Sequence, residues 1–369
     1  MVWRVKFWDP PKAFEAMETE VMATIRDVLA HGNLVLRQEL EDFERDLAAF
    51  VGTNHAVGVS NCTDGLQMIL EAAGIGPGDE VITVAHTFVA TLAAIHWVGA
   101  DPVLVDVGPD HNMDPEAVET AVTERTRAII PVHLNGRLCE MDRIQAIAEK
   151  HSLLVIEDTA QALGATFDGK AGGAWGAAGA FSFYPAKLLG AYGDAGAVVT
   201  SDLALSQQIS ALRDHGRTSK TEISGWGHNS RLDNLQAAIL SLKLKSVPNW
   251  ISRRRHLATM YDESLKPVEG VQRPPAPDTG RFFDIYQNYV VEAERRDGLH
   301  EYLARKGIET MISWPVPTHH QPIGLTRFDL PRTEALSEHV LSLPLHTDLL
   351  DSQVEQVIAA IDDFYQSPG

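Results

Sequence analysis

Residues 180–200 read AFSFYPAKLLGAYGDAGAVVT. The segment opens with a short apolar run, becomes rich in glycine and alanine, and closes on a second apolar run over 197–200. This pattern predicts two strands joined by a tight connection. The connection carries one lysine, Lys187, and no acidic residue adjoins it in the sequence. We therefore expect Lys187 to lie in a mostly apolar setting.

The chemical consequence concerns the amine of Lys187. Burial disfavours an ammonium ion, so the pKa of such a lysine falls and its free amine becomes a nucleophile toward carbonyl groups. Chemistry that depends on pyridoxal 5'-phosphate (PLP) requires such an amine. The alternative is an ordinary solvated lysine in a surface loop, and this segment alone leaves both interpretations open.

Two other segments place a carboxylate and an aromatic ring at the ends of apolar runs. Asp158 follows the run LLVI at 153–156. Ligands of open parallel sheets bind at the carboxyl ends of strands, and a carboxylate there can keep the pyridine nitrogen of PLP protonated. Asp158 could instead cap a helix that follows the strand. Phe88 follows the run at 81–84 and could stack on a pyridine ring or belong to the core.

A further segment has the features of a phosphate site. The sequence NCTDG at 61–65 lies between an expected strand at 56–60 and an expected helix at 66–73. Free N–H groups at the start of a helix, together with the hydroxyl of Thr63, suit a phosphate group. Asp64 opposes an anion there unless its role is to cap the helix.

Short apolar runs alternate with helical segments along most of the chain. This alternation predicts an α/β fold with a mainly parallel sheet and helices on both faces. The turn around Pro248 divides a large domain over 1–248 from a smaller C-terminal α+β domain over 249–369. Strands are expected at 55–59, 80–84, 102–106, 127–132, 153–157, 179–183, 196–200 and 286–292. Helices are expected at 12–30, 38–50, 203–213, 231–245 and 298–306.

The composition excludes several classes of protein. The 369 residues carry a formal net charge of −19, which argues against a partner that is nucleic acid or an anionic membrane. The 2 cysteines make no disulfide framework and fit a reducing, cytoplasmic location. Residues 1–11 contain no long apolar stretch, so no signal peptide is expected. No run approaches the ~20 apolar residues of a membrane span.

Two polar segments are ambiguous. Residues 214–228 form an expected surface loop that either closes over substrate or is a plain flexible connection. His319 and His320 are adjacent. Adjacent side chains in a strand point apart, and no cysteine or carboxylate cluster joins the two histidines, so we expect no metal site.

Taken together, these segments resemble the nucleotide-sugar aminotransferases of the DegT type, which have the aspartate aminotransferase fold (fold type I) and use PLP. The resemblance extends from near Gly32 to His346. It includes the motifs GPGDEV at 76–81, GADPV at 99–103 and NSRLDNLQAA at 229–238. Ordered motifs over such a length are far more specific than any single motif.

The resemblance implies roles for individual residues. Lys187 would bind the cofactor covalently, Asp158 would pair with the pyridine nitrogen, and Phe88 would stack on the ring. The remaining cofactor-binding residues would be Thr63, Asp64 and Ser182 at the phosphate, Gln161 at the O3′ side of the ring, and Asn229, which would reach the phosphate of a neighbouring subunit. Because of Asn229, the resemblance implies a homodimer with shared active sites. Candidates for contact with the substrate are His86, Tyr184, Arg231, Trp314 and His319.

The resemblance also implies an activity. It is the transamination of a nucleotide-linked keto sugar with an amino-acid donor such as L-glutamate, in amino-sugar and polysaccharide biosynthesis. Residues 190–197, GAYGDAGA, are similar to the pattern in relatives that act on 3-keto sugars. Departures from the family pattern at Asn135, Arg137 and Trp314 leave the exact sugar open. A 4-keto substrate and a non-catalytic PLP-binding sensor remain alternatives, whereas Lys187 counts against the related dehydratases, which have histidine there.

Overall fold

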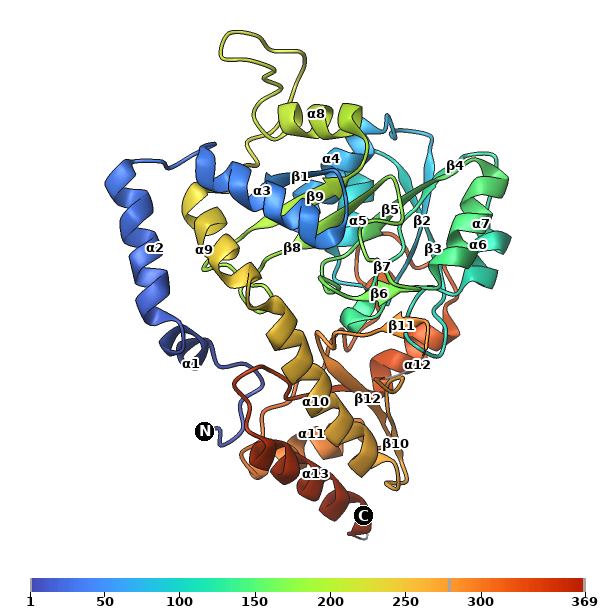
Figure 1. The fold of residues 1–369 in the computed structure, drawn as a ribbon. Coiled ribbons are helices and arrows are strands. Elements are labelled where there is room, and N and C mark those ends of the chain that lie inside the picture. The colour runs from blue at the N-terminus through green and yellow to red at the C-terminus, as the bar shows by residue number, and fades with distance from the viewer. Residues whose placement is uncertain (1, 278–279, 368–369) are drawn as a thin grey trace.

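The computed structural model describes residues 2–277 and 280–367, and a 7-stranded sheet forms its centre (Figure 1). Its strands are β1 (His55–Val59), β2 (Glu80–Val84), β3 (Asp101–Val105), β4 (Thr126–Ile129), β5 (Leu154–Asp158), β8 (Ala178–Ser182) and β9 (Gly196–Thr200). The order is β1-β9-β8-β5-β4-β2-β3. Neighbours from β8 to β3 are parallel, whereas β9 is antiparallel to both of its neighbours. The expected mainly parallel sheet is confirmed.

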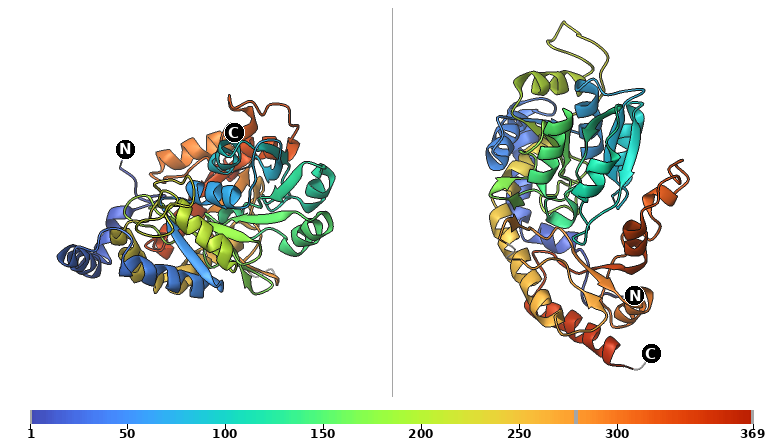
Figure 2. Two further views of the ribbon diagram at one scale, coloured as in Figure 1. Left: turned by 90° about the horizontal axis from the view of Figure 1, so that it is seen from above. Right: turned by 90° about the vertical axis from the view of Figure 1, so that its right-hand side faces the viewer.

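Helices cover both faces of this sheet, as Figure 2 shows. One face packs against α3 (Gln38–Val51), α6 (Pro115–Ala121), α7 (Met141–His151) and α9 (Asn234–Leu244). The other packs against α4 (Cys62–Ala72), α5 (Ala90–Trp97) and α8 (Leu203–Leu212). Successive side chains of a strand point to opposite faces, so Val198 joins one core and Val199 the other. Burial on both faces explains why these strands read as continuous apolar runs.

Most expected elements are confirmed within a few residues, and the differences have local causes. The helix expected at 12–30 is two helices, α1 (Pro10–Glu15) and α2 (Glu18–His31), because Met17 leaves the helical backbone at φ −130° and ψ 11°. The helix expected at 231–245 is α9, which begins only at Asn234 because Asp233 is extended, with ψ 138°.

The C-terminal part is built on α10 (Val247–Leu265), which has Pro248 in its first turn, where proline is tolerated. A 3-stranded antiparallel sheet packs beside it, with the order β10 (Val271–Gln272), β12 (Tyr289–Ala293) and β13 (Val340–Leu343). The strand expected at 286–292 starts later because Tyr286 has a left-handed backbone, with φ 50°. The helices of this part are α11 (Arg296–Arg305), α12 (Pro331–His339) and α13 (Asp351–Gln366).

The core of the C-terminal part also takes in a residue from the start of the chain. Val5 is fully buried there and pairs as an isolated bridge with Ile308. The division of the chain at residue 248 stays a prediction.

The remaining elements are short. A small sheet joins β11 (Phe282–Phe283), β6 (Thr166–Phe167) and β7 (Lys170–Ala171), and 3₁₀ turns lie at η1 (Leu134–Gly136) and η2 (Thr318–His320). Residues 214–228 leave the body beside α8 as a projecting arm, at the top of Figure 1. In the described part of the chain, no helix combines the length and the apolar character that crossing a membrane requires.

Candidate active site

Lys187 lies on the connection between β8 and β9, which is held as a tight turn. Its backbone N–H donates to the carbonyl of Tyr184 at 2.8 Å, and Ala191 N–H donates to the carbonyl of Phe183 at 2.8 Å. The turn closes on Gly190, where an added Cβ would lie 2.4 Å from the carbonyl oxygen of Pro185. Any larger residue at Gly190 would push the turn open, so the backbone under Lys187 is fixed by local packing.

The amine of Lys187 has the electrostatics of a nucleophile. Burial lowers its pKa below the usual 10.5, although Cys62 and Asp158 act in the opposite direction. A lowered pKa increases the fraction of free amine at neutral pH. These surroundings differ from those of a solvated lysine in a surface loop.

Asp158 ends β5, directly beside Ala180 on β8, and only 5% of its surface is exposed. Thr91 Oγ1 donates to its Oδ2 at 2.8 Å, and the N–H of Ala160 donates to its Oδ1 at 3.2 Å. Burial raises the pKa of this carboxyl group, while the Thr91 hydrogen bond lowers it. The segment after Asp158 is a turn and not a helix, so the alternative of a helix cap is wrong.

Thr91 belongs to a chain of hydroxyl groups that the sequence analysis missed. Thr87 Oγ1 and Thr91 Oγ1 lie 2.7 Å apart, and Thr318 Oγ1 donates to the carbonyl of Thr87 at 2.7 Å. Thr91 lies in the first turn of α5, whereas Thr87 lies in the bend before that helix, so no helical spacing in the sequence indicated this contact. The chain connects η2 to the carboxylate of Asp158.

The start of α4 has the helix geometry on which the predicted phosphate site depends. The Asn61 side chain accepts from the N–H of Asp64 at 2.8 Å, so it caps the helix. The first N–H groups of a helix, here those of Cys62 and Thr63, have no intrahelical acceptor and favour an anion. An added Cβ at Gly196 would lie 2.5 Å from the Asn61 backbone, so glycine lets β9 pack against this turn.

Two expected phosphate residues differ in their surroundings. Ser182 ends β8, partly exposed, and its Oγ accepts from the N–H of Tyr184 at 3.3 Å. Asp64 Oδ2 accepts from Ser230 Oγ at 2.7 Å. The carboxylate of Asp64 thus has a partner 166 positions away in the sequence.

The residues expected around the ring and substrate differ in exposure. Phe88 is 67% exposed, so the alternative that it belongs to the core is wrong. Tyr184 is also exposed. Gln161 Oε1 accepts from the N–H of Asn135 at 2.8 Å, which ties Gln161 to η1. The exposed ring of Phe88 offers an apolar surface for a flat ligand.

His86 and Trp314 lie together. His86 is buried against the rings of His111 and Trp314, with centroid distances of 5.7 and 5.4 Å. Burial lowers the pKa of His86 to about 3, so its imidazole is neutral at physiological pH.

Asn229 and Arg231 lie at the base of the arm. Asn229 is exposed and pairs as a bridge with Asp214. Arg231 Nη1 lies 3.0 Å from Asp214 Oδ1. The single chain therefore leaves the Asn229 side chain at the surface.

His319 and His320 do not behave as the sequence predicted. His319 is fully buried, and its Nε2 lies 3.2 Å from Glu334 Oε1. The two histidines lie on a 3₁₀ turn and not on a strand, so their rings lie alongside each other and a carboxylate joins them. The reasoning that they point apart is wrong.

The residues present fit PLP. The carboxylate of Asp158 is buried with a raised pKa, so a protonated pyridine nitrogen would supply the positive charge that it lacks. The start of α4 would hold the phosphate, and the Lys187 amine interacts electrostatically with Cys62 at the start of that helix and with Asp158. This fold and this site define a PLP-dependent transferase of fold type I.

The chain belongs to the DegT/DnrJ/EryC1/StrS aminotransferase family, whose model matches residues 15–362. It is 42% identical over 367 residues to the dTDP-3-amino-3,4,6-trideoxy-alpha-D-glucose transaminase of Streptomyces venezuelae, covering 98% of this chain and 96% of that protein. It is 38% identical over 359 residues to the UDP-2-acetamido-2-deoxy-3-oxo-D-glucuronate aminotransferase of Pseudomonas aeruginosa, covering 97% of this chain and 99% of that protein.

A solved structure agrees with these relatives. The crystal structure of S. venezuelae DesV in complex with a ketimine intermediate matches with a TM-score of 0.96 and 40% identity, covering 99% of this chain and 100% of that one. The protein is thus an aminotransferase that uses PLP, and the expected family, fold, enzyme class and cofactor are confirmed. The roles of individual residues stay predictions.

Proposed function

We propose that this protein transfers an amino group from an amino acid, such as L-glutamate, to the keto group at C3 of a nucleotide-linked sugar. The observation that carries the proposal is the Lys187 amine, which burial makes nucleophilic beside the buried Asp158. Support for the substrate class comes from the relatives, whose names specify 3-amino or 3-oxo sugar nucleotides. The sequence GAYGDAGA at 190–197 supports the same carbon.

Lys187 and Asp158 would divide the chemistry. PLP, when bound, supplies an electron sink for the bond that breaks at the donor's α-carbon. Asp158 would accept a hydrogen bond from the pyridine nitrogen and hold its proton. The Lys187 amine would hold the cofactor and then move a proton to or from the substrate carbon, as a general base and acid.

Other residues would bind and orient. Thr63, Ser182 and the N–H groups at the start of α4 would bind the phosphate, and the exposed ring of Phe88 would stack on the pyridine ring. Gln161, fixed by Asn135, would face the O3′ side. His86, Tyr184, Arg231 and Trp314 are the proposed contacts for the sugar nucleotide, whereas His319 is turned toward Glu334.

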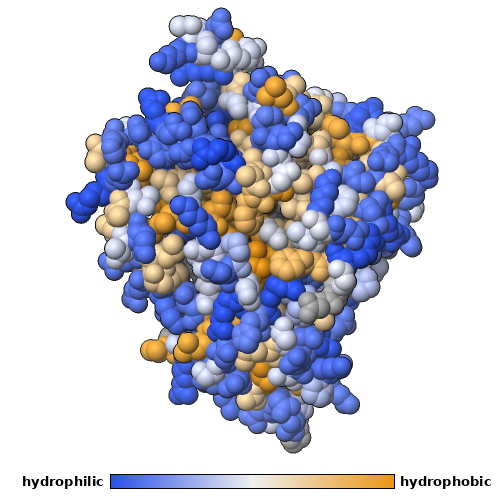
Figure 3. Space-filling model, in the orientation of Figure 1, coloured by the Kyte–Doolittle hydropathy of each residue, from blue (hydrophilic) through white to orange (hydrophobic). Residues whose placement is uncertain are grey.

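The proposed assembly is a homodimer in which each active site takes Asn229 from the other subunit. Support comes from the projecting arm, where Trp226 is 99% exposed and Ile223 is 68% exposed. Apolar side chains are also exposed on α2 and just after it, at Met22, Leu29, Leu34 and Val35. Figure 3 shows hydrophobic residues gathered near the centre of the face seen in Figure 1, with hydrophilic residues around them. Large exposed apolar areas of this kind mark interaction surfaces.

The location that we propose is the cytoplasm, in a pathway of amino-sugar or polysaccharide synthesis. Cys62 and Cys139 are free, buried thiols, which fits a reducing compartment.

The position of the new amino group in the product distinguishes amination at C3, which we propose, from amination at C4. The holoenzyme is incubated with L-glutamate and, in separate reactions, with 3-keto and 4-keto sugars linked to dTDP or UDP, and the product is examined by NMR. We expect nitrogen on C3. Nitrogen on C4, or acceptance of only 4-keto substrates, would overturn the proposal. A non-catalytic sensor would keep its visible absorption band when the amino donor is added, whereas the transaminase loses it.

A further inference from the structure

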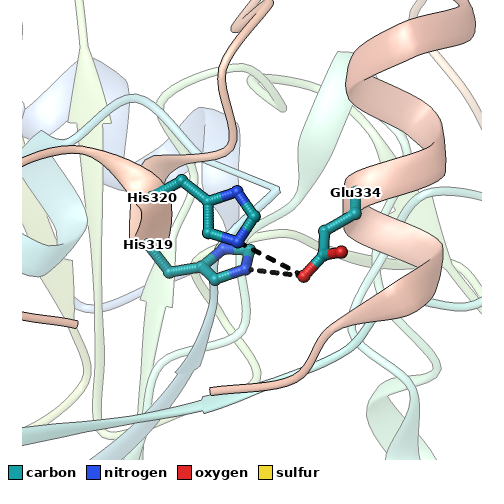
Figure 4. Close-up of side chains that lie close together, drawn as sticks. All are labelled: His319, His320 and Glu334. Carbon is teal, nitrogen blue, oxygen red and sulfur yellow. Dashed lines mark hydrogen bonds and ion pairs between the residues drawn. The ribbon is translucent and has the colours of Figure 1, made fainter. Parts of the chain in front are cut away.

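Next to the candidate active site, two histidines and a glutamate converge on one point (Figure 4). His319 and His320 extend from η2, and Glu334 extends from the first turn of α12. The Nε2 atoms of His319 and His320 lie 3.2 and 3.4 Å from the same oxygen, Glu334 Oε1. All three ligand atoms lie within 4.8 Å of one another. In the part of the chain that the structure describes, no other three histidine, cysteine or acidic side chains converge in this way.

The distances match a tetrahedral metal site. Zinc binds imidazole nitrogen and carboxylate oxygen at about 2.0–2.2 Å, which separates neighbouring ligand atoms of a tetrahedron by about 3.3–3.5 Å. The two distances to Glu334 Oε1, 3.2 and 3.4 Å, fall close to that spacing. Two histidines with one glutamate also form a known type of zinc ligand set that leaves a fourth position for water.

The burial of the three side chains suits a site that a metal ion can enter from solvent. His319 is fully buried at the inner side, whereas the side chains of His320 and Glu334 are 43% and 38% exposed. The Nδ1 atom of His319 is buried and has no hydrogen-bond partner among the described residues. A neutral imidazole binds a metal through Nε2 when its proton lies on Nδ1.

We propose that His319, His320 and Glu334 bind one divalent transition-metal ion of the zinc and cobalt class, with water in the remaining position. The ion links η2 to α12, two elements that are otherwise joined by an intervening loop. The same turn contacts the active-site segment through the hydrogen bond from Thr318 to the carbonyl of Thr87, 2.7 Å long. The metal acts as a structural clip between these two elements. None of its three ligands is a residue assigned above to the cofactor, and His319, named above as a candidate for substrate contact, would be a metal ligand instead.

The test measures metal binding directly. Protein without an affinity tag is dialysed against a chelator and titrated with ZnCl₂ by calorimetry, and with CoCl₂ by visible absorption. We expect one ion per chain, d–d bands typical of tetrahedral cobalt, and a higher Tm with zinc, because an ion that binds only the folded state stabilises it.

Variants locate the site. His320→Ala and Glu334→Gln change partly exposed side chains, so both should fold, and each should weaken zinc binding by at least about tenfold and remove the Tm increase. His256→Ala is the matched control, because His256 pairs with Asp351 at 3.1 Å on another part of the surface, and it should bind zinc like the parent protein. Binding of the parent protein no tighter than that of His320→Ala, or one-to-one binding that survives both ligand variants, would overturn the proposal.

Discussion

The strand ends near Lys187 and the arm with Asn229 at its base differ in burial: the first region is enclosed by the chain, and the second is exposed to solvent. At the strand ends, Asp158 is buried and accepts hydrogen bonds from Thr91, Ala160 and Cys62 of the same chain. On the arm, Asn229 is exposed and Trp226 is almost fully so. The proposed function therefore predicts that one chain builds the chemical half of the site by itself, whereas the peripheral half needs a second subunit. Variants in the two regions should therefore fail in different ways.

The largest effect is expected at the centre of the first region. Lys187→Ala should abolish turnover, because its amine is the group proposed to hold the cofactor covalently and to move the substrate proton. The fold should persist, since the turn is held by backbone contacts and by Gly190. Steady-state kinetics and circular dichroism check both statements. Near-normal turnover in the variant would remove Lys187 from the chemistry.

Asp158→Asn should lower kcat by about 10²–10³-fold, because the pyridine nitrogen loses the charge that keeps it protonated. Burial already raises the pKa of this carboxyl group, so removing the charge should not reduce the thermal stability of the protein without PLP. The kinetics are compared with melting curves of the PLP-free protein. A variant that loses stability and activity together would point to a structural role instead.

A variant in the second region should lose the proposed contact between Asn229 and the cofactor of the other subunit. Asn229→Ala should weaken PLP binding by roughly tenfold, the scale expected when one hydrogen bond to a charged group is lost. Mixing Asn229→Ala with Lys187→Ala protein under subunit exchange should restore activity, since a dimer with shared sites then contains one intact site. Sedimentation of a fully active monomer, or mixtures that stay inactive, would refute shared sites.

A smaller effect is expected at Thr91. This residue of α5 donates a hydrogen bond to Asp158 at the end of β5. Thr91→Val removes a hydrogen bond that lowers the pKa of Asp158, so that pKa should rise. Activity requires the carboxylate, and the acid limb of the pH–rate profile should therefore move to higher pH. Thr259→Val, whose hydroxyl donates to the carbonyl of Arg255 in α10, is the control and should leave the profile unchanged. An unshifted acid limb in Thr91→Val would contradict this link.

The same contrast explains what the sequence could predict. The strands were found because burial on both faces makes each one a continuous apolar run, and Asp158 and Lys187 were found because they follow such runs. The partners of Asp64 and Asp158 were not found, because Ser230 and Thr91 lie 166 and 67 positions away. The convergence of His319 and His320 depends on a 3₁₀ turn, and adjacent side chains converge or diverge according to backbone conformation.

The most direct test of the central claim identifies the lysine that holds the cofactor. Lys243 is a suitable competitor, because burial lowers its pKa to about 8 and its Nζ donates to the carbonyl of Gly190 at 2.7 Å, on the same turn. The holoenzyme is reduced with borohydride, digested, and mapped by mass spectrometry. We expect the pyridoxyl label on Lys187 alone. A label on Lys243, or on any other lysine in place of Lys187, would contradict it.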